Sequence, residues 1–444
     1  MTRTPPFIFS IVPSLILLSV AFLPSSRAGV VDPRCRVPDR GSTLRVFHVN
    51  SPCSPIRPAT GGLSWEENIL RMQAEDQVRL QFLSSLATGQ KSSVPIASGR
   101  QMIQSPTYIV RVQIGTPGQT MLMAVDTSND AAWVPCSGCV GCSSSTVFDP
   151  TKSTSFKAVG CQAAQCQQVP NPTCGVRSCS FNTSYAGSTI AASLSRDTFT
   201  LATDPISGYT FGCVQKAAGT SIPPQGLLGL GRGPLSLVSQ SQSLYQSTFS
   251  YCLPSSKSLN FSGSLRLGPV GQPVRIKYTP LLKNPRRSSL YYVNLIGIQV
   301  GRKVVDIPPA ALAFNSTSGA GTIIDSGTVF SRLVAPAYVA VRDEFRKRMG
   351  NATVTSLGGF DTCYNVPIVA PTITFVFDGM NVTLPQDNIL IHSTAGSTTC
   401  LAMAAAPDNV NSVLNVIASM QQQNHRVLFD VPNSRVGVAR EACS

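Results

Sequence analysis

The chain has 444 residues and a formal net charge of +14 at pH 7, and 43% of its residues are hydrophobic. That length exceeds one ordinary domain. The basic residues are mostly scattered, without interleaved aromatic residues or a nucleic-acid-binding motif, so a solvated surface is favoured over a nucleic-acid-binding one. Adhesion to acidic polymers remains an alternative use of the charge.

The first 28 residues have the pattern of a signal peptide. Arg3 precedes an apolar core at 7–23, and Ser26-Arg27-Ala28 offers small residues for cleavage after Ala28. The core is short and contains Pro13, which argues against a membrane-spanning helix. No later stretch is apolar enough to cross a bilayer, and the C-terminus has no retention signal. We therefore expect a secreted protein without a membrane span in its mature form.

Cysteine and asparagine patterns agree with export. Twelve of the fourteen cysteines lie between Cys136 and Cys443, and in an oxidising compartment they predict about six disulfides. A zinc cluster at Cys136, Cys139 and Cys142 is the less favoured alternative, so we expect no metal site. Five sequons are candidates for N-glycosylation, at Asn182, Asn260, Asn315, Asn351 and Asn381.

Residues 29–105 are interpreted as a propeptide. They contain one helical stretch at 65–86, whose apolar residues only partly follow a helical period, and a candidate strand at 44–49. Residues 1–105 carry eleven basic and six acidic side chains. A basic pro-segment can cover an acidic cleft until its carboxylates are protonated. The alternative is a disordered spacer.

From Tyr108 onward the pattern favours β-strands. Residues 108–115 alternate apolar and polar side chains, and Thr116-Pro117-Gly118 makes a turn. Recurrent Gly and Pro, frequent β-branched residues and few helical periods predict an all-β fold. One amphipathic helix is expected at 336–349, with Tyr338, Val341 and Phe345 on one side.

Two apolar runs each end in an aspartate, a hydroxyl residue and a small residue. They deliver Asp126 and Asp325, and a short apolar element follows each by about a hundred residues, at 227–231 and 416–419. Residues 291–298 also echo the strand at 108–115. This repetition predicts two similar lobes, at 106–272 and 273–444.

Two carboxylates in one pocket cannot both ionise freely, so one keeps a proton while the other stays charged. Such a pair provides an acid and a base for activating water. We therefore interpret Asp126 and Asp325 as one site built from the two halves of the chain.

At these motifs the sequence resembles the pepsin-like aspartic protease family, and within it the plant branch of nepenthesin-like and nucellin-like enzymes. The resemblance covers roughly residues 44–444. The residues that carry it are Ile114-Gly115-Thr116-Pro117, Asp126-Thr127-Ser128, Trp133-Val134-Pro135-Cys136, Phe148-Asp149-Pro150, Gly226-Leu227-Leu228-Gly229-Leu230-Gly231, Phe249-Ser250-Tyr251-Cys252-Leu253 and Asp325-Ser326-Gly327-Thr328.

The resemblance implies a bilobal all-β fold with an active-site cleft between two pseudo-symmetric lobes and the catalytic residues Asp126 and Asp325. It implies an endopeptidase with an acidic optimum, no cofactor, a protein or peptide substrate, and a monomer inhibited by its own propeptide. The implied location is the apoplast or cell wall, with the vacuole as an alternative. The remaining implied site residues are the active-site loop residues Thr127, Ser128, Ser326, Gly327 and Thr328, the flap residue Tyr185 backed by Trp133, and a Cys363–Cys400 disulfide.

Two positions depart from the family pattern. Ser128 stands where a glycine is usual, and it is expected to fit if its φ angle is negative and to hydrogen-bond Asp126. Ala418 stands where the second lobe usually has glycine. The rival hypothesis is a catalytically weak or silent relative that binds another enzyme or a cell-wall component. Both aspartates and a candidate flap tyrosine are present, which favours the enzyme.

Overall fold

The structure, a computed structural model, describes residues 43–48, 54, 64–88 and 108–443, with gaps at 145, 176–177, 220, 256–262, 394–396 and 408–411. The expected signal peptide and the sequon at Asn260 lie outside the described residues. No helix within the described ranges is both long and apolar enough to cross a membrane.

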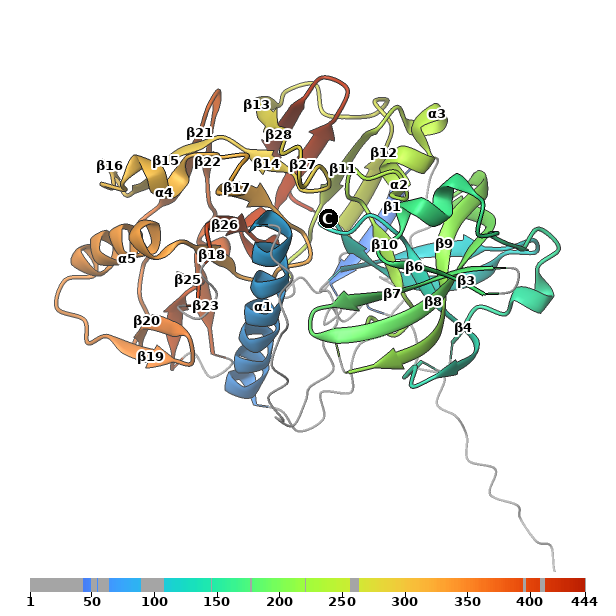
Figure 1. Ribbon diagram of the computed structural model, residues 1–444. Helices are drawn as coiled ribbons and strands as arrows, with labels where there is room; N and C mark the ends of the chain where they lie inside the picture. The colour runs from blue at the N-terminus through green and yellow to red at the C-terminus, as the bar shows by residue number, and fades with distance from the viewer. Residues whose placement is uncertain are drawn as a thin grey trace, which may run out of the picture.

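The fold is all-β and bilobal, as predicted (Figure 1). Six antiparallel strands join the two lobes in the order β1, β12, β11, β27, β28, β13. Their bounds are Thr43–His48, Gly263–Leu267, Thr248–Cys252, His425–Asp430, Arg435–Arg440 and Lys277–Leu282. Apolar side chains of this sheet, such as Phe249 and Phe429 with ring centroids 4.7 Å apart, form part of the main core.

The N-terminal lobe is organised around paired strands that deliver Asp126. Strand β3 pairs in parallel with β10, so that Asp126 lies opposite Gly229, and β10 also pairs with β4. The strands of this lobe that frame the site are β2 (Tyr108–Ile114), β3 (Gln119–Asp126), β4 (Trp133–Val140), β7 (Cys179–Tyr185), β8 (Ser188–Leu201), β9 (Asp204–Ala218) and β10 (Leu227–Gly229).

The C-terminal lobe repeats this arrangement. Strand β17 (Gly321–Ile324) leads into Asp325 and pairs in parallel with β26 (Leu414–Ile417), which also pairs with β18 (Ser331–Leu333). The apolar elements at 227–231 and 416–419 are therefore the partners of the two aspartate strands, which explains their similar spacing in the sequence. The other strands of this sheet are β14 (Tyr292–Val293) and β25 (Met403–Ala405).

Two smaller sheets complete this lobe, one of β15 (Leu295–Val300), β16 (Lys303–Val304), β21 (Ile373–Phe377) and β22 (Met380–Thr383), the other of β19 (Thr355–Leu357), β20 (Phe360–Tyr364), β23 (Leu390–His392) and β24 (Thr399–Leu401). The prediction of one continuous strand at 291–298 is wrong. This stretch contains two strands in different sheets, since β14 pairs with β17 and β15 pairs with β21. The helix expected at 336–349 is confirmed as α5 (Ala335–Arg348), with Tyr338, Val341 and Phe345 buried.

Before residue 108, the described residues of β1 and α1 are packed against the rest of the fold, so the alternative of a disordered spacer is wrong for them. Strand β1 pairs with both β12 and β2, and its Leu44 and Val46 are buried in the main core. The expected helix is α1 (Trp65–Thr88), which lies between the two lobes (Figure 1).

Six disulfides join the twelve cysteines from Cys136 to Cys443, as predicted. The Cys363–Cys400 pair implied by the family resemblance is present. Cys136 pairs with Cys213, and Cys139 pairs with Cys142, so these cysteines do not form a zinc cluster. The described sequon asparagines, Asn182, Asn315, Asn351 and Asn381, are all exposed.

Candidate active site

The two aspartates meet at the junction of the lobes, each at the end of a buried strand. Both are fully buried, and Arg79 of helix α1 contacts both of them. The turns that follow are joined across the lobes. The backbone N–H of Thr127 donates to the hydroxyl of Ser326 at 3.2 Å, and the N–H of Ser326 donates to Oγ1 of Thr127 at 3.0 Å. This exchange fixes the two turns against each other, so the carboxylates are held in place by backbone groups.

Asp126 is surrounded by donors from its own turn. Its Oδ1 accepts from the N–H of Ser128 at 2.8 Å and from the Ser128 hydroxyl at 3.0 Å, and its Oδ2 accepts from Nδ2 of Asn129 at 2.8 Å. Ser128 is absent from the residues of positive φ, so a side chain fits there without backbone strain. Both expectations for this unusual serine are therefore met.

Asp325 has fewer donors. The N–H of Gly327 donates to Oδ1 at 3.3 Å, and the Thr328 hydroxyl donates to Oδ2. A Cβ atom at Gly327 would lie 2.2 Å from Nη2 of Arg79. Glycine is therefore needed here to admit the arginine, whereas the serine of the first turn hydrogen-bonds to the same atom. The structure accommodates the methyl group of Ala418. This residue is fully buried and directly precedes a short helix, α6 (Ser419–Gln422).

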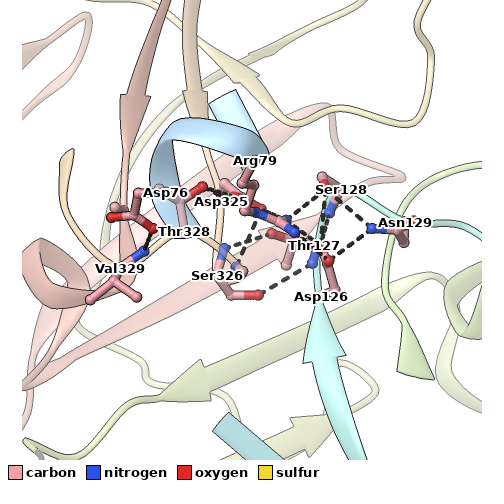
Figure 2. Close-up of polar contacts among 12 residues, drawn as sticks. Asp76, Arg79, Asp126, Thr127, Ser128, Asn129, Asp325, Ser326, Thr328 and Val329 are labelled. Carbon is pink, nitrogen blue, oxygen red and sulfur yellow. Dashed lines mark hydrogen bonds and ion pairs between the residues drawn. The ribbon is translucent and has the colours of Figure 1, made fainter. Parts of the chain in front are cut away.

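Arg79 of α1 is the central residue of the site, and no sequence motif marks it. Its Nη2 lies 2.7 Å from Oδ1 of Asp126 and 2.8 Å from Oδ1 of Asp325 (Figure 2). Its Nη1 donates to Oδ2 of Asp126 at 2.9 Å, and its Nε donates to Oδ2 of Asp325 at 2.8 Å. One guanidinium therefore binds both carboxylates in a bidentate manner, the strongest geometry for such a pair.

The charges at this site shift one another's pKa values. Burial alone would raise the pKa of Asp126, but the Arg79 guanidinium and the Ser128 donors outweigh burial and hold the pKa below its usual value. Burial alone would lower the pKa of Arg79, and the two carboxylates raise it instead. Arg79 therefore stays charged, and its ion pair with Asp126 persists until acid protonates the Asp126 carboxylate.

Tyr185 lies at the end of β7, where a hairpin with positive φ at Ala186 and Gly187 leads into β8. Its hydroxyl lies 3.2 Å from Oδ2 of Asp126 and 3.4 Å from Nη1 of Arg79. Its ring packs edge-on against Trp133, with centroids 5.8 Å apart. The structure thus brings together Asp126, Asp325, both turns, Tyr185 and Trp133.

Helix α1 is anchored mainly on the C-terminal lobe. Ile69 shares an apolar cluster with Phe330 and Phe360, and Leu80 and Leu83 share another with residues of β14, β17 and β26. One turn before Arg79, Asp76 accepts from the backbone N–H of Val329 at 2.7 Å (Figure 2). It also accepts from the backbone N–H of Phe330 at 2.6 Å. The sequence carries no signal that identifies Arg79, because it is one of two arginines on this helix and no motif surrounds it.

Several known proteins are similar to this chain. Sequence models described as xylanase inhibitor N-terminal and xylanase inhibitor C-terminal match residues 108–269 and 290–440. Aspartyl protease AED3 of Arabidopsis thaliana is 53% identical over 418 residues, covering 92% of this chain and 93% of that protein. Aspartyl protease 25 of Oryza sativa subsp. japonica is 48% identical over 425 residues, covering 90% and 94%.

More distant relatives are also similar to this chain, in sequence or in fold. Aspartic proteinase nepenthesin-1 of Nepenthes gracilis is 32% identical over 443 residues and covers 97% of both chains. The crystal structure of basic 7S globulin from soybean has a TM-score of 0.61 at 22% identity, covering 76% of this chain and 93% of that one, and supports the fold alone. By sequence and by fold, the chain belongs to the plant pepsin-like aspartic protease family.

Proposed function

We propose that the chain is the precursor of a secreted aspartic endopeptidase that works at acidic pH. The observation that carries the proposal is the position of Nη2 of Arg79, within 2.8 Å of both Asp126 and Asp325. A water oxygen in the same place would reach both carboxylates, because hydrogen bonds of water to carboxylates have similar lengths.

In the proposed reaction the ionised aspartate takes a proton from this water, whose oxygen attacks the scissile carbonyl carbon. The protonated aspartate donates to the developing oxyanion. Collapse of the tetrahedral intermediate breaks the C–N bond. The leaving amine takes the proton that the first aspartate removed from the water, and the diol hydroxyl returns its proton to the partner aspartate. Asp126 is the better candidate for the ionised partner, because Ser128 and Asn129 supply three hydrogen bonds to its oxygens.

The same geometry supports a zymogen. Arg79 fills the position of the proposed water, and α1 covers both aspartates and Tyr185. Substrate therefore cannot bind while α1 is in place, and removal of the segment before residue 108 would open the cleft. Secretion to the apoplast or cell wall, with the vacuole as an alternative, belongs to this proposal, as does action as a monomer on protein or peptide substrates.

The alternative is a protein of this fold that binds another enzyme instead of cleaving peptides. The names of the matching sequence models, which refer to xylanase inhibitors, favour it. The two aspartates, the joined turns and the tyrosine favour catalysis, because an inhibitor needs none of them.

The test is digestion of denatured globin after acid treatment, with and without pepstatin, by the wild-type chain and the Asp126→Asn variant. We expect pepstatin-sensitive cleavage by the wild type and none by the variant. A wild type as inert as Asp126→Asn at every acidic pH would refute the enzyme and leave the binding protein as the better interpretation.

A further inference from the structure

The backbone carbonyl groups of the two aspartates are held by different kinds of donor. The carbonyl of Asp126 accepts from the backbone N–H of Leu230, directly after β10, at 2.8 Å. The carbonyl of Asp325 accepts instead from a side chain, Nε2 of Gln422 in α6, at 3.1 Å. The two lobes therefore repeat the aspartate strand but not the group that fixes the peptide after it.

The chain after β26 turns into α6 and directs its N–H groups away from Asp325. The N–H of Ser419, the residue that matches Leu230 of the other lobe, donates to the carbonyl of Thr328 at 2.9 Å. The N–H of Ala418 donates to a serine hydroxyl of β18 at 2.9 Å. A buried carbonyl without a donor is unfavourable, so a side chain has to supply the donor that the backbone provides in the other lobe.

The amide group of Gln422 is itself fixed on both sides. Its Nε2 also donates to the carbonyl of Ile417 at 2.8 Å, and the same carbonyl accepts from the N–H of Asp325 at 3.1 Å. Its Oε1 accepts from the hydroxyl of Tyr251 in β11. Because carbonyl oxygens can only accept, the amide nitrogen has to face them and the amide oxygen has to face the tyrosine. Gln422 is 4% exposed and Tyr251 is fully buried, so bulk water does not compete for these contacts.

We propose that Gln422 is a positioning residue for Asp325, and that Tyr251 orients its amide group. This inference rests on the proposed function. Gln422 binds the backbone carbonyl of Asp325 and not the carboxylate, so it acts on the reaction only through the position of the aspartate. A displacement of about 1 Å at a reacting group can lower a rate by about a hundredfold. The amide should therefore affect turnover and leave substrate binding almost unchanged.

The kinetic test compares Gln422→Met with a matched control, Gln421→Met, in the processed enzyme. Gln421 is 2% exposed, and its Nε2 donates to the carbonyls of Asn388 at 2.8 Å and Ala402 at 3.0 Å, outside the aspartate turns. Both variants lose two buried hydrogen bonds and should have lower melting temperatures. We expect kcat to fall by about tenfold to a hundredfold in Gln422→Met alone, with KM nearly unchanged. Equal values of kcat in the two variants would overturn the proposal.

Gln422→Glu separates the donated hydrogen bond from the shape of the side chain. A protonated carboxyl can donate to the Asp325 carbonyl and accept from Tyr251, whereas an ionised carboxylate can only accept. The ordinary pKa of such a carboxyl is about 4.3, and burial raises it. We expect kcat relative to the wild type to be highest at about pH 3 and to fall as this group ionises. A relative kcat that is independent of pH would contradict the role of Gln422 as a donor.

Tyr251→Phe tests whether the tyrosine acts through the amide. The variant removes only the hydroxyl that Oε1 of Gln422 accepts from, so kcat should fall less than in Gln422→Met. The double variant Tyr251→Phe/Gln422→Met should have the same kcat as Gln422→Met, because the hydroxyl has no amide left to orient. Losses of kcat that multiply in the double variant would show that Tyr251 acts independently.

The position of Asp325 can also be measured without catalysis, in the full-length chain at pH 7. Arg79 of α1 binds both oxygens of this carboxylate, each at 2.8 Å, so a displaced Asp325 should hold the helix less tightly. We expect the amides of α1 to exchange hydrogen faster in Gln422→Met than in Gln421→Met. Equal exchange rates would overturn the positioning role. A wild type that cleaves no substrate would refute the proposed function, and the exchange rates would still decide whether Gln422 positions Asp325.

Discussion

Trp133 and Arg332 occupy matching positions in the two lobes. Trp133 lies opposite Leu227 of β10, and Arg332 lies opposite Val416 of β26, where β10 and β26 are the parallel partners of the two aspartate strands. Each residue follows its aspartate by seven positions. Trp133 packs behind Tyr185, whereas Arg332 is buried and its Nη2 lies 3.5 Å from the carbonyl of Gln73 in α1. The duplicated framework therefore carries an aromatic side chain at this position in one lobe and a cation in the other.

Replacing Arg79 should release the pro-segment. Arg79→Gln removes the bidentate pairs with Asp126 and Asp325, and each charge-assisted hydrogen bond is worth about 1.5–3 kcal/mol. We expect self-processing at pH 5–6 to accelerate by about tenfold to a hundredfold, as measured by mass spectrometry over time.

Arg71→Gln is the matched control, since Arg71 lies on the same helix and pairs only loosely with Glu75, at 3.7 Å. Its processing rate should change by less than about twofold, because this pair lies within α1 and does not join the helix to either lobe. Equal rates for Arg79→Gln and the wild type would show that Arg79 does not hold the helix in place.

Acid should loosen strand β1 through His48. Burial lowers the pKa of His48 to about 4 from its ordinary value near 6.5. Between these pH values a detached strand binds a proton that the paired strand excludes, so the stabilisation is complete above about pH 6.5 and is lost as the pH falls toward 4. The loss amounts to roughly 3 kcal/mol.

His48→Phe keeps an aromatic ring near Tyr108, which His48 contacts edge-on at 5.2 Å. In an Asp126→Asn background, which prevents processing, hydrogen exchange of the β1 amides should depend less on pH between 6.5 and 4 in the variant. The two proteins are compared by how steeply the exchange rate of the β1 amides changes with pH, and not by their protection at pH 7. The same pH dependence in both proteins would show that His48 does not cause the loosening of β1 by acid.

Protonation of Asp76 should stabilise the docked helix α1, whereas protonation of His48 destabilises the paired strand β1. Burial raises its pKa to about 7, against the effect of Arg332 and two backbone donors. Between about pH 7 and 3.9 the docked helix therefore binds a proton that the free helix does not, and acid favours docking through this group. In the processing-defective background, Asp76→Asn should make dissociation of α1 depend more steeply on falling pH, which hydrogen exchange of the helix amides would detect. A shallower dependence would contradict this sign.

Ser128→Gly should keep or raise the activity of the processed enzyme. The backbone N–H of residue 128 still donates to Asp126, and only the hydroxyl contact at 3.0 Å is lost. The variant should also release Arg79 more readily, because the hydroxyl accepts from its Nη2 at 2.8 Å. Values of kcat and KM at several acidic pH values provide the check. A large loss of kcat would assign the hydroxyl a role of its own.

Tyr185→Phe should lower kcat/KM by about threefold to tenfold, the effect of one ordinary hydrogen bond, since the ring still packs against Trp133. Tyr364→Phe is the control, because Tyr364 is fully buried and its hydroxyl has no hydrogen-bond partner among the described residues. Tyr364→Phe should therefore leave kcat/KM nearly unchanged. Equal effects of both substitutions would point to packing rather than to the contact with Asp126.

Local pattern in the sequence was sufficient for the all-β class, the two aspartate turns, the helix at 65–86 and the lobe duplication. Alternation, turn residues and apolar runs act between near neighbours, so a single sequence displays them. The repeated spacing between each aspartate and its apolar partner element was visible for the same reason, although only the strand pairing explains it.

Only the tertiary structure decided which residue occupies the space between the aspartates. Arg79 is separated from Asp126 by 47 positions and from Asp325 by 246, and nothing near it in the sequence distinguishes it from Arg71 of the same helix. The tertiary structure also decided the division of residues 291–298 between two sheets and the burial of Arg332 against the carbonyl of Gln73. Such contacts depend on how distant elements pack, and burial strengthens a charge pair only once that packing exists.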